Sequence, residues 1–341
     1  MSKEYTPVLI ITLNRINHLE KCVESLKRNS LAKETDLYIG VDFPPCEKYE
    51  NGYSEVLSYV ETINGFRNVY IVKHPKNVGP AMNHSILRKM ILETHEKYIF
   101  SEDDNEFSPN YLEFMNCMLD ENRTDSVLAI NGYGYPIECG TAPGEYVYLD
   151  TYFSGFGYGI WKENWKLLDE NVNKESFLKY YKNFRMIRKF RAISPNQYCN
   201  FVKGMTEYIP DLIKDGEVRK VDLSFGIFAF FNGMKIVSPA VSKVKNWGYD
   251  GSGVNCNIQE RTNSIETTYR NYNYMQQPMD EKSNLGEICP VSEEIQDQIN
   301  KQLNNFFYIP RKELFVTDIT YLASIILGLN NTKRIISILK K

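Results

Sequence analysis

Short apolar, β-branched runs alternate with segments of helical spacing through the first hundred residues of this 341-residue chain. The apolar runs are continuous, which is typical of strands buried on both faces of a parallel sheet. Four such strands separated by three helices predict an α/β fold with a doubly wound, mostly parallel sheet flanked by helices. The expected strands are residues 7–13, 37–42, 69–72 and 98–100, and the expected helices are residues 18–28, 53–63 and 81–94.

Carboxylates follow two of the predicted strands. Asp42 ends the second strand, and the triplet Glu102-Asp103-Asp104 follows the fourth. Because the carboxyl ends of parallel strands share the edge where open α/β sheets bind ligands, these acids are expected to lie together there. Like charges this close favour a counter-cation, and Mg²⁺ or Mn²⁺ would accept one or two carboxylates together with phosphate oxygens of a substrate. The alternatives are a solvated acidic loop for the triplet and a turn cap for Asp42.

Beyond residue 125 the alternation of strands and helices is less regular. Residues 317–341 have the pattern of basic amphipathic helices and predict a helical C-terminal extension. We expect this extension either to pack against the body or a second subunit, or to rest on an anionic membrane surface. The other expected elements are strands at 127–130, 146–149 and 235–237, helices from Trp161 and over 223–231, a helical or irregular stretch at 175–215, and a polar excursion at 257–284.

The composition narrows the classes of partner. A net charge of −3 and a pI near 6.0 argue against nucleic-acid binding, which normally needs a basic excess. The seven cysteines are scattered without a C-x-x-C pair, as expected for reduced thiols. The first residues lack the apolar run of a signal peptide, and no apolar stretch of about 18 residues could span a bilayer. We therefore expect a cytoplasmic protein, with the C-terminal helix as the candidate for contact with the inner face of the cell membrane.

Four segments of the first half occur in a distinctive order: Thr12-Leu13-Asn14-Arg15, Asp42, Asn77 to Asn83, and the acidic triplet. In this order and spacing they resemble a GT-A glycosyltransferase of the bacterial family 2 group. Residues 102–109 add a local likeness to N-acetylglucosaminyltransferase I. Individually these motifs are weak, but together they are specific.

The second half continues the resemblance. Residues 156–165 are similar to the aromatic and glycine-rich acceptor segment of these enzymes, and residues 246–253 are similar to their late donor loop. The resemblance implies that residues 1–125 form the nucleotide-sugar-binding half and residues 126–256 the acceptor-binding and catalytic half of one domain. Residues 257–341 would then contain the polar excursion and the amphipathic C-terminal helices.

Carried over residue by residue, the resemblance implies a donor site and a metal site. Asp104 would bind Mn²⁺ or Mg²⁺, Asp103 would contact ribose or sugar hydroxyls, and Glu102 would only shape the turn. Relatives often place a histidine near the end of the late loop, but here that position holds Asn255, which would be a weaker metal ligand. The residues expected to bind the donor are Thr12, Asn14, Arg15, Asp42, Asn77, Gly79, Asp103, Trp247, Gly251 and Ser252.

The resemblance also implies a catalytic base and an acceptor platform. Asp222 stands just before a predicted helix and would remove the proton from the acceptor hydroxyl, although an aspartate there is also a good helix N-cap. The expected acceptor-binding residues are Phe156, Gly157, Tyr158 and Trp161, with plain core packing as the alternative. The glycines around Phe156 lack the full G-x-G-x-x-G pattern of a dinucleotide loop.

The function implied is that of an inverting glycosyltransferase in bacterial surface polysaccharide synthesis, such as capsule or O-antigen. It would move a sugar from a nucleotide-diphosphate donor, with UDP-GlcNAc or UDP-Gal as examples, to a hydroxyl of a saccharide or lipid-linked saccharide. A non-catalytic nucleotide-sugar or saccharide-binding protein on the same fold is an alternative, favoured by the missing histidine. A sugar-nucleotide pyrophosphorylase fits less well, because Thr12 to Arg15 is not a glycine-rich loop. The donor sugar, acceptor, linkage and oligomeric state do not follow from the sequence.

Overall fold

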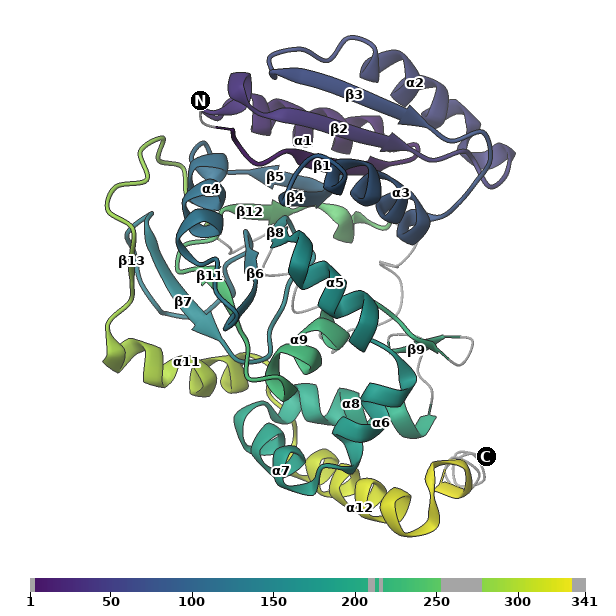
Figure 1. The fold of residues 1–341 in the computed structure, drawn as a ribbon, viewed down its shortest axis with the longest axis vertical. Helices are drawn as coiled ribbons and strands as arrows, with labels where there is room; N and C mark the ends of the chain where they lie inside the picture. The colour runs from purple at the N-terminus through teal and green to yellow at the C-terminus, as the bar shows by residue number, and fades with distance from the viewer. Residues whose placement is uncertain (1–3, 208–211, 215–216, 253–277, 333–341) are drawn as a thin grey trace.

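The computed structural model describes residues 4–207, 212–214, 217–252 and 278–332. Within these residues, nine strands form one mixed, mostly parallel sheet with helices on both faces (Figure 1), so the predicted fold class is confirmed. The strands lie in the spatial order β13-β7-β11-β6-β8-β4-β1-β2-β3. In chain order they are β1 (Val8–Thr12), β2 (Asp36–Val41), β3 (Asn68–Lys73), β4 (Lys97–Glu102), β6 (Val127–Asn131), β7 (Glu145–Leu149), β8 (Tyr158–Trp161), β11 (Lys235–Pro239) and β13 (Cys289–Pro290).

The predicted alternation in the first hundred residues is confirmed. The strands β1, β2, β3 and β4 pair in parallel, and their carboxyl ends meet at one edge of the sheet. The strand β4 is longer than predicted and includes Glu102, so the acidic triplet begins inside the strand. The helices between these strands are α1 (Ile16–Lys27), α2 (Glu50–Val60) and α3 (Pro80–Leu92).

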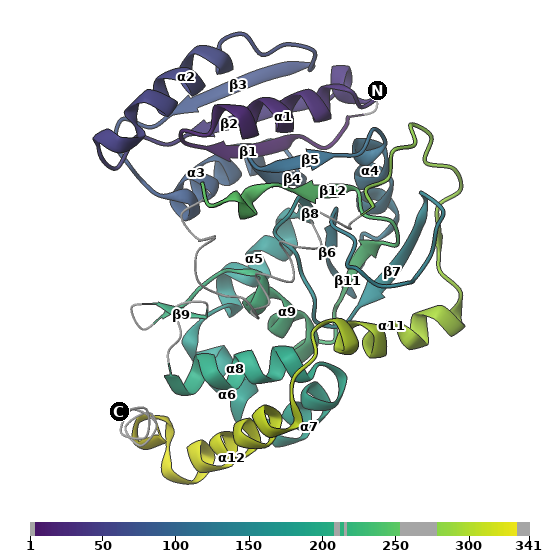
Figure 2. The same ribbon diagram turned by 180° about the vertical axis from the view of Figure 1, so that it is seen from behind.

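Both faces of the sheet are buried, as the continuous apolar runs predicted. In β1, Val8 and Ile10 belong to one hydrophobic cluster, and Leu9 and Ile11 belong to a second cluster on the opposite face. The first cluster contains side chains of α1, α2 and α4 (Tyr111–Glu121), and the second contains side chains of α3 and α5 (Lys162–Asn171). Figures 1 and 2 show these helices on the two sides of the sheet.

The strand β8 was not predicted and corrects the interpretation of the glycine-rich segment. Its residues were expected to lie between a strand and a helix, but they form a strand between β4 and β6, antiparallel to both. Gly159 explains why the segment looks unlike a strand. A Cβ atom at this position would lie 2.9 Å from terminal side-chain atoms of Leu119 and Met115, so a larger residue would push these side chains of α4 away from the strand.

A second, smaller ladder holds the residues that follow the acidic triplet. After a turn at Asp103 and Asp104, the strand β5 (Asn105–Phe107) pairs in antiparallel register with β12 (Val244–Asn246). This pairing was not predicted. It brings the late segment from residue 246 onward directly beside the triplet, although the two are about 140 residues apart in the chain.

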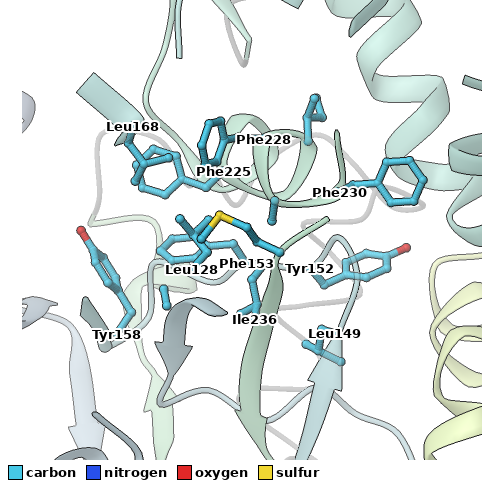
Figure 3. Packing of buried hydrophobic residues seen from close by; sticks show 14 of the residues in the cluster. Leu128, Leu149, Tyr152, Phe153, Tyr158, Leu168, Phe225, Phe228, Phe230 and Ile236 are labelled. Carbon is cyan, nitrogen blue, oxygen red and sulfur yellow. The ribbon is translucent and has the colours of Figure 1, made fainter. Parts of the chain in front are cut away.

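The helix α9 (Asp222–Phe231) covers the second face of the sheet, where its aromatic side chains pack on the strands (Figure 3). Phe225 packs edge-on against Phe153 and Trp165, with ring centroids 5.0 and 5.5 Å away. These aromatic rings belong to the same cluster as Leu128 and Ile236 of the sheet. Because Phe225 is anchored in this way, the first residue of α9, Asp222, has a fixed position.

Most of the remaining described chain is helical, and it also contains two strands of two residues each. The helices α7 and α12 both pack on α8, at the end of the molecule opposite β3 (Figures 1 and 2). The helix expected near the C-terminus begins earlier than predicted, and most of the polar excursion and residues 333–341 lie outside the described residues. None of the described helices is long and apolar enough to cross a membrane. The elements are α6 (Lys174–Lys182), α7 (Phe184–Ile193), α8 (Pro195–Glu207), β9 (Ile213–Lys214), β10 (Glu217–Val218), α11 (Glu293–Phe306) and α12 (Arg311–Leu327).

Candidate active site

A cavity of about 380 Å³ opens at the carboxyl ends of β1, β2 and β4, at the edge where the sequence predicted a ligand site. Glu102, Tyr49 and Gly248 also line it, and the sequence analysis had given none of them a role in binding. The predicted donor and metal residues that line this cavity are Thr12, Asn14, Arg15, Asp42, Asn77, Gly79, Asp103, Asp104 and Ser252.

Arg15 holds the acidic turn together. One guanidinium nitrogen, Nη2, donates to Asp103 and also to Asp104 Oδ2, the latter at 2.8 Å. The other oxygen of Asp103 accepts a hydrogen bond of 2.7 Å from the Thr12 hydroxyl. The last residue of β1, Thr12, and the nearby Arg15 therefore fix the two carboxylates that follow β4, and Arg15 cancels part of the repulsion between these acids.

Burial and charge shift the ionisation of these groups. Burial works against the charge on Arg15, but Asp103 and Asp104 outweigh it and raise the pKa of the guanidinium. Burial raises the pKa of Asp103, although Arg15 opposes the shift. Desolvation by the cavity walls and the negative charge of Asp104 raise the pKa of Glu102 to about 8. The turn thus carries less negative charge than three free carboxylates would.

The late segment packs directly on Asp104. Asn246 Nδ2 donates to Asp104 Oδ1 at 2.8 Å, and the Trp247 backbone N–H donates to the Asp104 carbonyl oxygen at 2.7 Å. A Cβ atom on Gly248 would lie 2.2 Å from Asp104 Oδ2, so only glycine fits there. The late segment from residue 246 onward therefore lies directly against the acidic turn.

The Trp247 side chain does not line the main cavity. Its ring lies between two ammonium groups, with Lys21 Nζ 3.9 Å and Lys245 Nζ 4.6 Å from the centroid, and its Nε1 donates to Glu106. It borders a smaller cavity of about 190 Å³ on the other side of Asp104. Trp247 thus anchors the late segment, and the main cavity is lined by Gly248 and Ser252 from this segment, but not by Gly251.

Asp42 organises the loop before α3. Its carboxylate accepts hydrogen bonds from the backbone N–H groups of Phe43, Val78 and Gly79 at 2.8 to 2.9 Å, and from Asn77 Nδ2 at 3.1 Å. Four donors use the acceptor capacity of a carboxylate. Asp42 therefore shapes the cavity wall, and its expected contact with ribose or base stays a prediction.

Replacing Asp42 with Asn is expected to loosen this wall. An amide nitrogen would face N–H donors, which should lower the free energy of unfolding by about 1–3 kcal/mol and weaken donor binding. The matched control is Asp36→Asn at the opposite end of β2, where an equally buried carboxylate bonds to Arg67 and Asn68. Calorimetric titration with donor should show weaker binding for Asp42→Asn only. Equal donor affinity in the two variants would contradict the role given to Asp42.

Asp222 lies at the first turn of α9, and the N-cap alternative is not observed. The cap bonds run between Ser224 Oγ and the backbone of Val221. The Asp222 carboxylate instead accepts the Gly155 N–H at 3.0 Å. Although Asp222 is exposed at the surface, desolvation by the surrounding protein raises the pKa of its carboxyl group to about 6, against the lowering effect of the Gly155 N–H. A carboxyl group with this pKa can take up a proton near neutral pH.

Asp222 and Glu102 lie within electrostatic reach of each other. Desolvation and the negative charges of Asp104, Asp103 and, least of all, Asp222 raise the pKa of Glu102, whereas the positive charge of Arg15 lowers it. Asp222 does not line the main cavity. The family resemblance implies only a turn-shaping role for Glu102, but the residue lines the cavity. Its place at the end of β4 was the signal that could have identified it.

The predicted acceptor residues separate into two groups. Trp161 is 2% exposed and donates from Nε1 to the Leu119 carbonyl oxygen, and Tyr158 packs on Phe100 and Phe153. These two are core residues, so the structure does not support them as an acceptor platform. Their alternation in β8 puts them in the clusters on opposite faces of the sheet.

Phe156 remains beside the site. It is partly buried and meets Tyr249 of the late segment edge-on, with ring centroids 6.4 Å apart. Gly157 has a positive φ of 67° at the turn into β8. Phe156 therefore connects the neighbourhood of Asp222 to the late segment, whereas Gly157 shapes the turn.

The oxygen donors of the cavity suit a hard divalent ion. No group of three or more His, Cys, Asp or Glu side chains able to hold a metal is found among the described residues. However, Mg²⁺ and Mn²⁺ need only one or two carboxylates when a substrate diphosphate supplies other ligands. Each oxygen of Asp104 accepts one protein hydrogen bond, so each keeps a lone pair for an ion. Asn255 lies outside the described residues.

Comparison with known proteins gives weak similarities. No protein-family model matches the chain, and no curated protein matches its sequence. The chain is similar to S. aureus TarS at 17% identity and a TM-score of 0.35, over 49% of this chain and 29% of that chain. The chain thus spans less than a third of that TarS chain.

Two further solved structures are similar to the chain. S. aureus TarS 1–349 matches at 13% identity and a TM-score of 0.43, over 96% of this chain and 89% of that chain. The other structure is a mannosyltransferase from Pyrobaculum calidifontis, PcManGT, in complex with GDP-Man and Mn²⁺. The mannosyltransferase matches at 14% identity and a TM-score of 0.33, over 49% of this chain and 47% of that chain. Because these TM-scores are low, the function has to be inferred from the residues of the site.

Proposed function

We propose that this protein is an inverting glycosyltransferase that moves a sugar from a nucleotide-diphosphate donor to a saccharide hydroxyl. The observation that carries the proposal is the presence of two unlike carboxylates at one edge of the sheet. Asp104 is ion-paired beside a cavity of about 380 Å³, and Asp222 stands outside this cavity with its pKa raised to about 6. The first suits diphosphate binding through a metal ion, and the second suits proton removal.

The donor would occupy the cavity between the ends of β1, β2 and β4. Thr12, Asn14 and the loop shaped by Asp42 would surround the base and ribose, and Arg15 would contribute positive charge near the phosphates. Asp104 would hold Mn²⁺ or Mg²⁺, and the ion would supply charge neutralisation for the leaving diphosphate. UDP is the nucleotide that we expect.

Asp222 would act on the acceptor. Its carboxylate would take the proton of an acceptor hydroxyl while that oxygen bonds to the anomeric carbon and the bond from this carbon to the diphosphate oxygen breaks. Attack from the side opposite the leaving group inverts the anomeric configuration. Phe156, next to the Gly155 N–H that bonds Asp222, would offer an apolar surface to a sugar ring. The setting that we propose is cytoplasmic synthesis of a bacterial surface polysaccharide, with a saccharide or lipid-linked saccharide as acceptor.

A binding protein without turnover is the second candidate. It is favoured by Arg15, whose guanidinium already pairs with both Asp103 and Asp104. The acids can therefore be accommodated in the folded state without a metal ion. Such a protein would bind nucleotide sugars but release no nucleotide, and Asp222→Asn would not change its behaviour.

A thermal-shift screen of UDP-, GDP- and dTDP-sugars, with and without Mn²⁺, tests the donor and the metal together. A ligand that binds only the folded state raises the Tm, and we expect the largest rise with a UDP-sugar plus Mn²⁺. Asp104→Asn should remove the contribution of Mn²⁺ and lower nucleotide release on the order of 10²-fold or more. The control is Asp120→Asn, an exposed carboxylate on α4. If the protein released no nucleotide from any of these donors, with or without metal, the enzymatic proposal would be refuted.

A further inference from the structure

The helix α12 presents its apolar side to solvent and its polar side to the protein. The buried residues are Thr317, Tyr321 and Ser324, which recur at helical spacing on one face. Apolar side chains that are 45% to 79% exposed occupy the rest of the circumference. They are Phe315, Val316, Ile319, Leu322, Ile325, Ile326 and Leu327. This arrangement is the reverse of that expected for a helix on the surface of a soluble protein.

Specific hydrogen bonds fix this orientation. The Tyr181 hydroxyl and Ser324 Oγ are 2.7 Å apart, and the Tyr321 hydroxyl donates to the Tyr181 carbonyl oxygen at 3.1 Å. Arg191 of α7 donates to both carboxylate oxygens of Asp318 at 2.7 Å. Rotating the helix to bury its apolar side would break all of these bonds. The exposed apolar stripe is therefore a stable feature of the fold.

Basic side chains flank the stripe. Both acids of α12 are paired within the protein, Glu313 with Lys203 and Asp318 with Arg191. The helix α7 lies beside α12 in both views (Figures 1 and 2), and it carries exposed Arg185, Arg188 and Lys189. Within the described part of the chain, these three have no salt-bridge partner. Exposed Arg311 and Lys312 begin α12 itself.

We propose that this end of the molecule, formed by the apolar stripe of α12 and the basic residues of α7, docks on an anionic membrane surface. Apolar side chains would enter the boundary between headgroups and acyl chains while arginine and lysine meet lipid phosphates. The unpaired positive charge favours an anionic lipid surface over a second copy of the chain, which would bring the same charges. This inference is independent of the proposed sugar transfer.

Flotation with lipid vesicles tests the proposal on the full chain. We expect binding to vesicles of equal parts phosphatidylcholine and phosphatidylglycerol, weak binding to phosphatidylcholine alone, and weaker binding at high salt. Ile319→Gln with Ile326→Gln should reduce binding about tenfold or more. Arg185→Gln and Arg188→Gln should each reduce binding to the anionic vesicles about fivefold. The control pair is Met90→Gln with Leu167→Gln on α3 and α5, both 39% exposed, which should bind like the unmodified chain.

Three results would overturn the proposal. They are a lack of binding to anionic vesicles, equal loss of binding in the control pair, and undiminished binding after both isoleucines are replaced. Analytical ultracentrifugation without lipid tests the alternative that a second copy of the chain binds the stripe. A dimer that dissociates in the Ile319→Gln, Ile326→Gln variant, together with no vesicle binding by the unmodified chain, would show that the stripe is an interface between copies. Because no step of the test uses a sugar nucleotide, failure here leaves the proposed transferase activity unaffected.

Discussion

Replacing Asp222 with Asn is expected to lower the rate of donor consumption by about 10²–10⁴-fold while donor affinity stays the same. Asn has nearly the shape of Asp, and its Oδ1 can still accept the Gly155 N–H that bonds Asp222. It cannot take up the acceptor proton. Because Asp222 does not line the donor cavity, its loss should leave donor binding unchanged in calorimetric titration.

The pH profile separates a base from a structural residue. The pKa of Asp222 is raised to about 6, so below this pH the carboxyl is protonated and cannot act as a base. The rate for the unmodified protein should therefore rise with pH up to about 6 and level off above it. The residual rate of Asp222→Asn should lack this rise. Asp169→Asn is the control, since Asp169 is a carboxylate paired with Arg88 and Lys220 and has no proposed part in proton transfer. A rise near pH 6 that persists in Asp222→Asn would assign it to another group.

Replacing Lys243 with Met should lower the free energy of unfolding by about 3–5 kcal/mol. Lys243 is 0% exposed, and its ammonium group donates to Asp280 at 2.5 Å. Asn110 Nδ2 also donates to this carboxylate, at 2.7 Å. Met fills the space of the lysine stem but leaves the buried Asp280 charge without its counter-ion.

Chemical denaturation of single and double variants measures this effect. The double variant Lys243→Met, Asp280→Asn should recover part of the lost stability, because it removes the uncompensated charge as well. A surface control is Lys179→Met, which breaks an exposed pair with Glu175 and should change stability by less than about 1 kcal/mol. A similarly small loss in Lys243→Met would mean that the buried pair contributes little. The pair matters for the site because Asp280 fixes the chain where it returns beside β12.

The sheet was predictable where burial on both faces leaves a continuous apolar run. Residues 8–12 and 36–41 are such runs, and they were found. The strand β8 was missed because it is four residues long and contains Gly159, whose role depends on the distant side chains of α4. The ladder of β5 and β12 was missed because its strands are three residues long and far apart in sequence. A local sequence pattern does not show which segments, far apart in the chain, lie side by side in the fold.

The candidate site was predictable to the level of which strand ends would meet. The acids after β2 and β4 line one cavity because parallel strands end at one edge. The pairing of Arg15 with two carboxylates, and the four hydrogen bonds to Asp42, depend on how loops fold in three dimensions. Trp161 was expected to bind the acceptor but lies in the core. The sequence alone does not distinguish a tryptophan packed in a core from one that stacks on a sugar. The metal role of Asn255 stays a prediction.

The position of β8 limits how this protein can move. It pairs with β4, which carries the acidic turn, and with β6. The other neighbour of β6 is β11, and the helix α9, which begins with Asp222, packs on β11. One hydrogen-bonded sheet therefore connects the acidic turn to the part of the chain that carries Asp222, so these two parts cannot open and close about a hinge as two domains could. The separation between the acidic turn and Asp222 is therefore set when the chain folds.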